Sequence, residues 1–265
     1  MKRAIIIASE RADHQQTWGG AFAEGLRRHG WHATVEKSAG PCDLLAMWGV
    51  RRDHLVREQK QAGGEVVILE RGYLADRFQW ASVSFGGRLN GRAEFRGPFA
   101  DPSRWQNHFA HLMQPWRTRR EGVALICGQV ATDAAVRHVD IEAFYKSARD
   151  SFTKKGFQVK FRPHPLANRM RRPAPSRPLA EDLADAALAV TFNSNSGVDA
   201  VLAGVPTVAV DRGSMVWDVS GHVLDVPPQV DRSAWAHAIA WKQWQMDEIA
   251  AGACWDAIGR ERVTA

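Results

Sequence analysis

The sequence predicts an α/β protein with two doubly wound domains that face a cleft. Short apolar runs alternate with longer amphipathic segments along most of the chain, which is the pattern of parallel strands covered by helices. A polar, arginine-rich stretch at 98–120 interrupts this alternation, which then begins afresh. A chain of 265 residues, 45% of them hydrophobic, is long enough for two such domains. We place the first domain at 1–115 and the second at 116–265.

The first half carries the signals of three strands and three helices. Strands are expected at the apolar runs 3–8, 44–48 and 65–70, and helices at 19–29, 53–62 and 104–113. Glycines mark the ends of the first two helices, at Gly30 and Gly63. The stretch 71–97 is rich in Gly and Arg and is expected to be loop, with at most a short strand or hairpin.

The second half repeats the alternation. Strands are expected at 122–127, 158–162, 188–192 and 207–210, and helices at 141–155, 179–184 and 197–203. A basic, proline-rich loop is expected at 169–178. The last helix is expected to run from 233 to 259, with Asp231 or Ser233 as its N-cap.

Charge and cysteine usage limit the class of protein. The net charge of +6 and a pI near 9.5 favour an anionic partner, such as a nucleotide, a nucleic acid, an acidic glycan or a membrane surface. The three cysteines show no CxxC spacing, so neither a disulfide framework nor a zinc site is indicated. The first apolar run stops after about five residues, which is too short for a signal peptide or a transmembrane segment. We therefore expect a cytoplasmic protein without a transmembrane segment.

The segment Leu188–Val210 reads as a strand, a turn, a short helix and a second strand. The turn holds Asn193, Ser194, Asn195, Ser196 and Gly197. Free amides at a helix start, together with small hydroxyls, can bind a phosphate group, and a glycine lets a ligand approach the backbone. Ser196 with Asp199 is equally a capping box, so a phosphate site and an ordinary cap stay open here.

A histidine between two prolines follows the strand at 158–162. In a parallel sheet, ligands collect at the carboxyl ends of the strands, so His164 and the turn after 188–192 would face one crevice. Pro163 and Pro165 fix the backbone on both sides of the imidazole. Arg162 is a further phosphate candidate by its location. The alternative is a loop histidine without a partner.

Two more groups of residues could bind or react with a ligand. Asp133, with Gln129 in the loop after the strand at 122–127, could be a base, a nucleophile or a helix N-cap. In the first half, polar residues follow the strand at 65–70, and an Asn-Gly turn comes later. These residues are candidates for binding a second ligand, and they are Glu70, Arg71, Tyr73, Arg77, Asn90 and Arg92. The alternatives are that the Asn-Gly pair forms a hairpin turn and that the arginines are solvated.

Three motifs in order resemble the capsule-polysaccharide synthesis family, which includes the Kdo transferases. They are Gln129-x-x-x-Asp133, Arg162-Pro163-His164-Pro165, and Thr191–Ser196 followed by Asp199 and Pro206. The resemblance covers about 122–214. It implies a GT-B architecture of two Rossmann-like domains and a nucleotide-sugar donor, often a CMP-sugar.

The resemblance also implies roles for single residues. His164, Ser194 and Ser196 would hold the donor phosphate, with Asn195 and Gly197 in the same loop. Asp133 would be the catalytic carboxylate, and Gln129 a nearby positioning group.

The resulting prediction is a glycosyltransferase that uses no metal and no cofactor besides its nucleotide-sugar substrate. The sequence contains no Asp-x-Asp motif, the usual metal–diphosphate clamp of the other large glycosyltransferase fold. The acceptor is expected on the first half. A hydroxylated base in DNA, as in phage DNA, is preferred because that half is rich in Arg and Trp. The alternatives are a glycan or lipid of the cell surface, or a non-catalytic nucleotide- or nucleic-acid-binding protein of the same fold.

Overall fold

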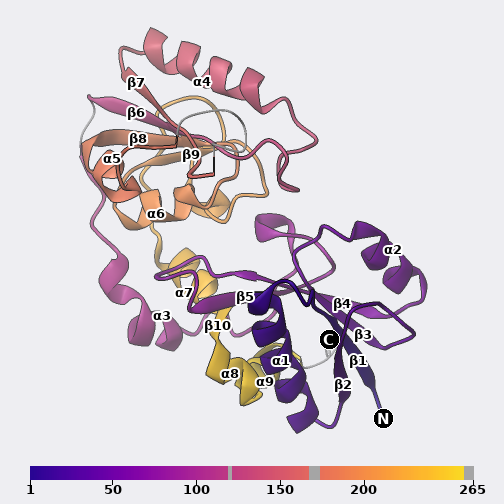
Figure 1. Cartoon of the computed structure of the whole chain (residues 1–265). Helices are drawn as coiled ribbons and strands as arrows, with labels where there is room; N and C mark the ends of the chain where they lie inside the picture. Colours follow the sequence, from indigo (N-terminus) through magenta and orange to yellow (C-terminus); the bar gives the residue numbers. More distant parts are fainter. Residues whose placement is uncertain (119–120, 167–173, 260–265) are drawn as a thin grey trace. The chain divides into compact units, whose positions relative to one another are not determined.

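The computed structural model describes residues 1–118, 121–166 and 174–259, which form two compact α/β units (Figure 1). Unit 1 consists of Met1–Leu89, Ala93–Trp105 and the segment from His237 onward. Unit 2 consists of Asn90–Arg92 and Gln106–Ala236. Residues 169–173 of the expected basic loop lie outside the described residues.

Unit 1 is built on a six-stranded sheet in the order β10-β5-β4-β3-β1-β2. Strands β1 to β4 are parallel, and β5 and β10 are added antiparallel at one edge. The strands are β1 (Arg3–Ile7), β2 (His32–Glu36), β3 (Leu44–Trp48), β4 (Glu65–Arg71), β5 (Trp80–Phe85) and β10 (Gln243–Gln245).

Helices cover both faces of this sheet because its central strands are apolar on both sides. Ile6 and Ala46 belong to the core that contains Phe22 of α1 (Asp13–Arg28). Ile5 and Met47, one residue away along each strand, pack with α2 (Asp53–Gln61). The first face also receives α8 (Met246–Ala250) and α9 (Ala253–Ile258).

Unit 2 is a smaller parallel sheet in the order β7-β6-β8-β9. Its strands are β6 (Val123–Cys127), β7 (Gln158–Arg162), β8 (Ala186–Thr191) and β9 (Thr207–Ala209). One face packs on α4 (Ile141–Lys154), and the other packs on α5 (Leu179–Asp185) and α6 (Ser196–Leu202). The predicted doubly wound α/β class is therefore confirmed, and the expected strands of this half lie within two residues of the observed ones.

Short helices complete the described chain. They are η1 (Asn90–Arg92), α3 (Ser103–His108), η2 (Ala110–Leu112), η4 (Trp217–Val219) and α7 (Ser233–Ala240). None of the helices in the described part of the chain is both long and apolar enough to cross a bilayer.

The C-terminal segment differs from the prediction. It was expected to be one helix of the second domain, whereas beyond Ala236 it belongs to unit 1 and is divided into α7, β10, α8 and α9. Gln243 causes the change: its buried side-chain oxygen accepts the N–H groups of Tyr73, at 2.6 Å, and Leu74, at 2.9 Å. These bonds and the pairing of β10 with β5 replace the continuous helix.

Strands β2 and β10 of unit 1 escaped the prediction, and β5 lies in the stretch 71–97, where at most a short strand or hairpin was expected. Strand β2 is an edge strand with a single fully buried residue, Ala33, so it lacks an apolar run. Strand β5 is buried along its whole length and contains Ser82 and Ser84, which weaken its apolar signal.

Candidate functional site

Four loops meet at the carboxyl edge of the unit 2 sheet. They follow β6, β7, β8 and β9. The loop after β6 lies between the loops after β7 and β8, and all three carry predicted site residues. The N–H of Gly128 donates to the carbonyl of Arg162 at 2.8 Å. A Cβ atom on Gly128 would lie 2.9 Å from the Phe161 ring and 3.0 Å from that carbonyl, so only glycine allows this approach. The loop that carries His164 therefore begins beside the end of β6.

The serine loop lies on the other side of β6. The Ser194 N–H donates to the Thr191 hydroxyl at 2.8 Å, and the hydroxyls of Ser194 and Ser196 are 2.8 Å apart. The Ser196 hydroxyl lies near the thiol of Cys127, the last residue of β6. Burial raises the pKa of Cys127 to about 12, and Arg162 and Ser196 offset this only in part. The thiol is therefore protonated at neutral pH, and the serine hydroxyls are the groups that this loop offers a ligand.

The start of α6 differs from the free-amide site that the motif indicated. The Ser196 N–H donates to the Ser194 hydroxyl at 3.2 Å, and the Gly197 N–H donates to the Ser194 carbonyl at 3.0 Å. The Val198 N–H is bonded to the Asn195 carbonyl. The capping hydroxyl is thus Ser194, and these three amides are already used within the loop.

Gly197 lies in close packing contact with its neighbours, and its role in the approach of a ligand stays a prediction. A Cβ atom at this position would lie 3.0 Å from a methyl group of Val216 and 3.4 Å from one of Thr191. Both contacts are tight, so glycine allows α6 to pack closely on its neighbours.

His164 is half-buried and its ring is fixed by a backbone contact. Its Nδ1 accepts the N–H of Leu166 at 3.0 Å. In the neutral ring the proton is therefore on Nε2, which leaves an N–H donor for a ligand. Burial lowers the pKa of His164, and the nearby Asp133 carboxylate opposes this shift. His164 and Asp133 thus interact, and the histidine is neutral at pH 7.

Asp133 does not cap the following helix. It lies in a series of turns and is exposed. The N-cap of α4 is Asp140, whose side chain accepts the Ala143 N–H at 3.0 Å. Of the three readings left open for Asp133, a base or a nucleophile fits its position better than a cap.

Side-chain amides join the loops after β6, β8 and β9 into one network, whereas the loop after β7 is linked to it through the backbone bond from Gly128 to Arg162. Gln129 donates from Nε2 to Oδ1 of Asn193 at 2.7 Å, and its Oε1 accepts the Asn193 N–H at 3.1 Å. Asn193 in turn donates to Asp211 at 2.9 Å, and Asp211 pairs with Arg92. Burial alone would raise the pKa of Asp211, but hydrogen bonds from Asn193 and Arg92 outweigh it and lower the pKa. Gln129 therefore positions the loops, since both ends of its amide are bonded within the protein.

Asp211 was missed by the sequence reading. It directly follows the expected strand at 207–210, so the rule that ligands collect at carboxyl ends would have found it.

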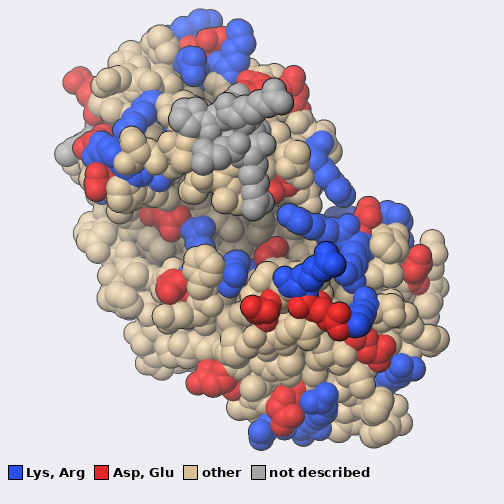
Figure 2. Space-filling model, in the orientation of Figure 1, with Lys and Arg blue, Asp and Glu red and all other residues tan. Residues whose placement is uncertain are grey.

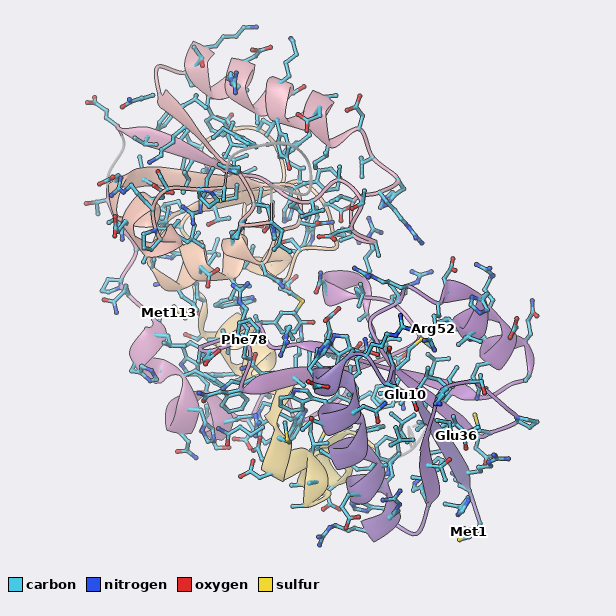
Figure 3. All side chains as sticks on the ribbon, viewed as in Figure 1. Met1, Glu10, Glu36, Arg52, Phe78 and Met113 are labelled. Carbon is cyan, nitrogen blue, oxygen red and sulfur yellow. The ribbon has the colours of Figure 1, made fainter. Side chains whose placement is uncertain are left out.

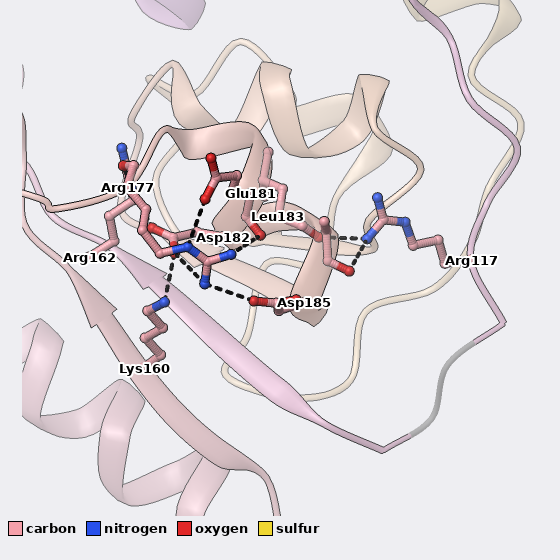
Figure 4. Close-up of polar contacts among 9 residues, drawn as sticks. Arg117, Lys160, Arg162, Arg177, Glu181, Asp182, Leu183 and Asp185 are labelled. Atoms are coloured by element: carbon pink, nitrogen blue, oxygen red, sulfur yellow. Dashed lines mark hydrogen bonds and ion pairs between the residues drawn. The ribbon is translucent and has the colours of Figure 1, made fainter.

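Arg162 points toward α5, where it binds Asp182 (Figure 4). Arg162 and Lys160 are two residues apart and lie on the same face of β7. Both side chains bind the carboxylate of Asp182 in α5, Lys160 at a distance of 2.6 Å. Burial would raise the pKa of Asp182, but these two cations lower it. The guanidinium of Arg162 is 9% exposed and also donates to the Arg177 carbonyl at 2.8 Å. Its donor-binding role stays a prediction, and the contacts observed here are structural.

The candidates from the first half divide between the two units. Tyr73 was expected to face a crevice, but it is 2% exposed, and burial raises the pKa of its hydroxyl. Asn90 and Arg92 belong to unit 2, where the Gly91 N–H donates to the Gly213 carbonyl at 3.0 Å. The remaining three, Glu70, Arg71 and Arg77, lie at or after the end of β4 in unit 1.

Neither a known family model nor any curated protein sequence matches this chain. Its fold does match solved structures. Over 92% of its length the chain is similar to a β-Kdo 2,7 transferase structure of KpsC from Thermosulfurimonas dismutans, with 92% of that chain covered, 13% identity and a TM-score of 0.62.

A second similar structure is a β-Kdo 2,4 transferase of the same organism's KpsC. It has a TM-score of 0.59 and 12% identity, with 91% of this chain and 92% of that chain covered. The chain therefore has the GT-B-like fold of capsule-synthesis glycosyltransferases. At these identities the likeness is one of fold.

Proposed function

We propose that this protein is a glycosyltransferase whose unit 2 binds a nucleotide-sugar donor. The observation that carries the proposal is that the loops with Asp133, His164 and the serines follow three neighbouring strands, β6, β7 and β8, at one edge of one sheet. This edge is the switch point of the doubly wound sheet, between β6 and β8, where ligands of such folds bind. The GT-B-like fold is consistent with the same chemistry.

The donor phosphate would be held by neutral donors. The Nε2–H of His164 can donate one hydrogen bond to a phosphate oxygen. The serine hydroxyl that accepts in the bond between Ser194 and Ser196 can donate another, and the second serine can do so once it gives up that bond. Their bonds would strengthen as the sugar–phosphate bond breaks and negative charge grows on the leaving group. In this proposal the leaving group is stabilised without a metal, and a CMP-sugar is the first choice of donor.

Asp133 would be the reacting carboxylate. It accepts the proton of the acceptor hydroxyl while the hydroxyl oxygen bonds to the anomeric carbon. The bond from that carbon to the phosphate oxygen breaks, and the nucleotide leaves with the electron pair. Its exposed position suits a group that must meet an incoming acceptor.

The acceptor would bind to unit 1. A hydroxylated DNA base stays a prediction from charge and composition, and a surface glycan or lipid is the alternative. Phosphate contacts make DNA binding fall steeply with salt. Salt-sensitive binding of the full chain to DNA would favour the first acceptor, and its absence would favour the second.

The test is nucleotide release by the full chain without acceptor, measured across CMP-, UDP- and GDP-sugars. We expect release from one nucleotide class, lost in His164→Ala and kept in His54→Ala, which removes an exposed histidine of α2. Release from none of the donors would contradict the proposal and favour a non-catalytic nucleotide-binding protein.

A further inference from the structure

A cation and two aromatic rings meet at the carboxyl edge of the unit 1 sheet. Trp48 ends β3 and Arg71 ends β4. The Cζ atom of Arg71 lies 4.4 Å from the centre of the Phe78 ring and 5.4 Å from that of the Trp48 ring. Both distances are in the range of cation–π contacts, so the rings hold the guanidinium in place. We call Trp48, Arg71 and Phe78 the arginine site.

The guanidinium of Arg71 makes no hydrogen bond or ion pair with any residue that the structure describes. Its backbone N–H donates to Glu70 at 3.2 Å, and its side chain contacts only the two rings. Two buried arginines, Arg104 of unit 1 and Arg162 of unit 2, each bind a carboxylate instead, and the buried Arg232 donates to two backbone carbonyls. Arg71 is therefore half-buried, oriented, and left with its planar N–H donors for a ligand.

The neighbouring side chains Phe78 and His14 provide an apolar surface and add no charge to that of Arg71. Phe78 is 71% exposed, although one side of its ring contacts the guanidinium. His14, in the first turn of α1, meets the Trp48 ring edge-on with centroids 5.0 Å apart. Burial and the charge of Arg71 lower the pKa of His14 and outweigh Asp13, so this histidine is neutral at pH 7.

The surrounding loops are basic. Exposed cations follow β1, β2 and β3, and Figure 2 shows Lys and Arg side chains gathered on this part of unit 1. They are Arg11, Lys37, Arg51 and Arg52. Lys37 pairs with Glu10 at 2.7 Å and its carbonyl accepts a bond from Arg52, in keeping with the positions of Glu10 and Arg52 in Figure 3. The positive field raises the local concentration of anions.

We propose that Arg71 recognises an oxyanion, a carboxylate or a phosphate, on the acceptor, and that Phe78 packs against the ring that bears it. Both groups present two oxygens to the planar fork of an arginine. That the ligand is the acceptor rests on the proposed function, whereas the recognition of an oxyanion beside a ring does not.

The test is ligand-observed NMR binding of three probes to the full chain: glucuronate, glucose 6-phosphate and uncharged glucose. We expect one or both anions to bind and glucose not to bind. Arg71→Gln should weaken anion binding about tenfold or more, and Arg71→Lys nearly as much, because a lysine keeps the charge but loses the fork. Phe78→Ala should weaken it by a smaller factor.

The control is Arg28→Gln, which removes one exposed positive charge at the far end of α1 and should leave binding unchanged. The preferred anion separates a carboxylate from a phosphate ligand. No binding of either anion, full binding by Arg71→Lys, or equal losses in Arg71→Gln and Arg28→Gln would each overturn the proposal. Anion binding is measured without a nucleotide-sugar donor, so failure of this proposal is distinct from failure of the donor site.

Discussion

The two units share a parallel core with one strand order, yet their carboxyl edges are chemically different. In each, the second strand flanks the first on one side, and the third and fourth follow on the other: β2-β1-β3-β4 and β7-β6-β8-β9. The unit 2 edge is a network of amides, hydroxyls and carboxylates bonded to one another, such as Gln129, Asn193 and Asp211. The unit 1 edge presents Arg71 against two aromatic rings.

This difference shows that topology places the sites and loop residues decide their chemistry. The network of unit 2 fixes the loops after β6, β8 and β9 before any ligand arrives, which suits a site that must orient reacting groups. The arginine site of unit 1 keeps its donors unused, which suits recognition of a group that the ligand supplies. The comparison can be tested by changes that should affect one unit and not the other.

The largest expected effect is on turnover and separates the two edges. His164→Ala should lower nucleotide release without acceptor by about 10²–10⁴-fold, because a positioned donor to the leaving group is lost. Arg71→Gln should leave that release unchanged and lower only transfer to an acceptor. Steady-state kinetics with and without acceptor measure both. If the two variants lose release equally, the division of roles between the units is wrong.

The next largest effect is on stability and compares a buried ion pair in each unit. Asp182→Ala leaves Arg162 and Lys160 without their carboxylate and should cost unit 2 about 3–5 kcal/mol. Glu248→Ala in unit 1 should cost less, about 1–3 kcal/mol, because Arg104 keeps bonds to two carbonyls and lies 4.2 Å from the centre of the Trp244 ring. Calorimetric unfolding measures both losses.

The matched control for the ion pairs is Glu181→Ala. Glu181 is the neighbour of Asp182 in α5 and binds Arg177 on the surface, with 54% of its side chain exposed. Its loss should change the free energy of unfolding by at most about 1 kcal/mol. A loss of stability as large as that of Asp182→Ala would show that any substitution in α5 destabilises unit 2 equally. The buried ion pair would then not explain the effect of Asp182→Ala.

The sequence predicted the parallel cores well because buried central strands leave continuous apolar runs. The run 44–48 matches β3 residue for residue, and the run 122–127 matches β6 to within one residue. The C-terminal segment could not be predicted, because a helical pattern at 233–259 does not show that Gln243 will bind a loop about 170 residues earlier in the chain.

The site was predicted only where motif and strand end coincide. His164 and the serines follow predicted strands, so their shared edge could be inferred. The partners of the arginines could not be inferred from the sequence. Arg162 binds Asp182 of α5, whereas Arg71 lies against aromatic rings. Sequence spacing does not distinguish a paired arginine from an unpaired one.

The smallest expected effect is on the pKa values of the two histidines, His14 and His164. Burial lowers both pKa values, but the neighbouring charges have opposite signs: Arg71 lowers that of His14, and Asp133 raises that of His164. Arg71→Gln should therefore raise the pKa of His14, and Asp133→Asn should lower that of His164 further. NMR titration of the imidazole resonances measures each shift, and each variant should leave the other histidine unchanged.

The same shifts fix the sign of the pH dependence of stability. Because both folded pKa values lie below the ordinary value of 6.5, the unfolded chain binds more protons in the window beneath it. The stability contributed by neutral histidines is thus complete above pH 6.5 and is lost as the pH falls through 6.5 toward the folded values. Asp133→Asn should steepen this loss and Arg71→Gln should reduce it. The absence of a pKa shift in both variants would show that burial alone sets these pKa values and that the two edges do not differ electrostatically.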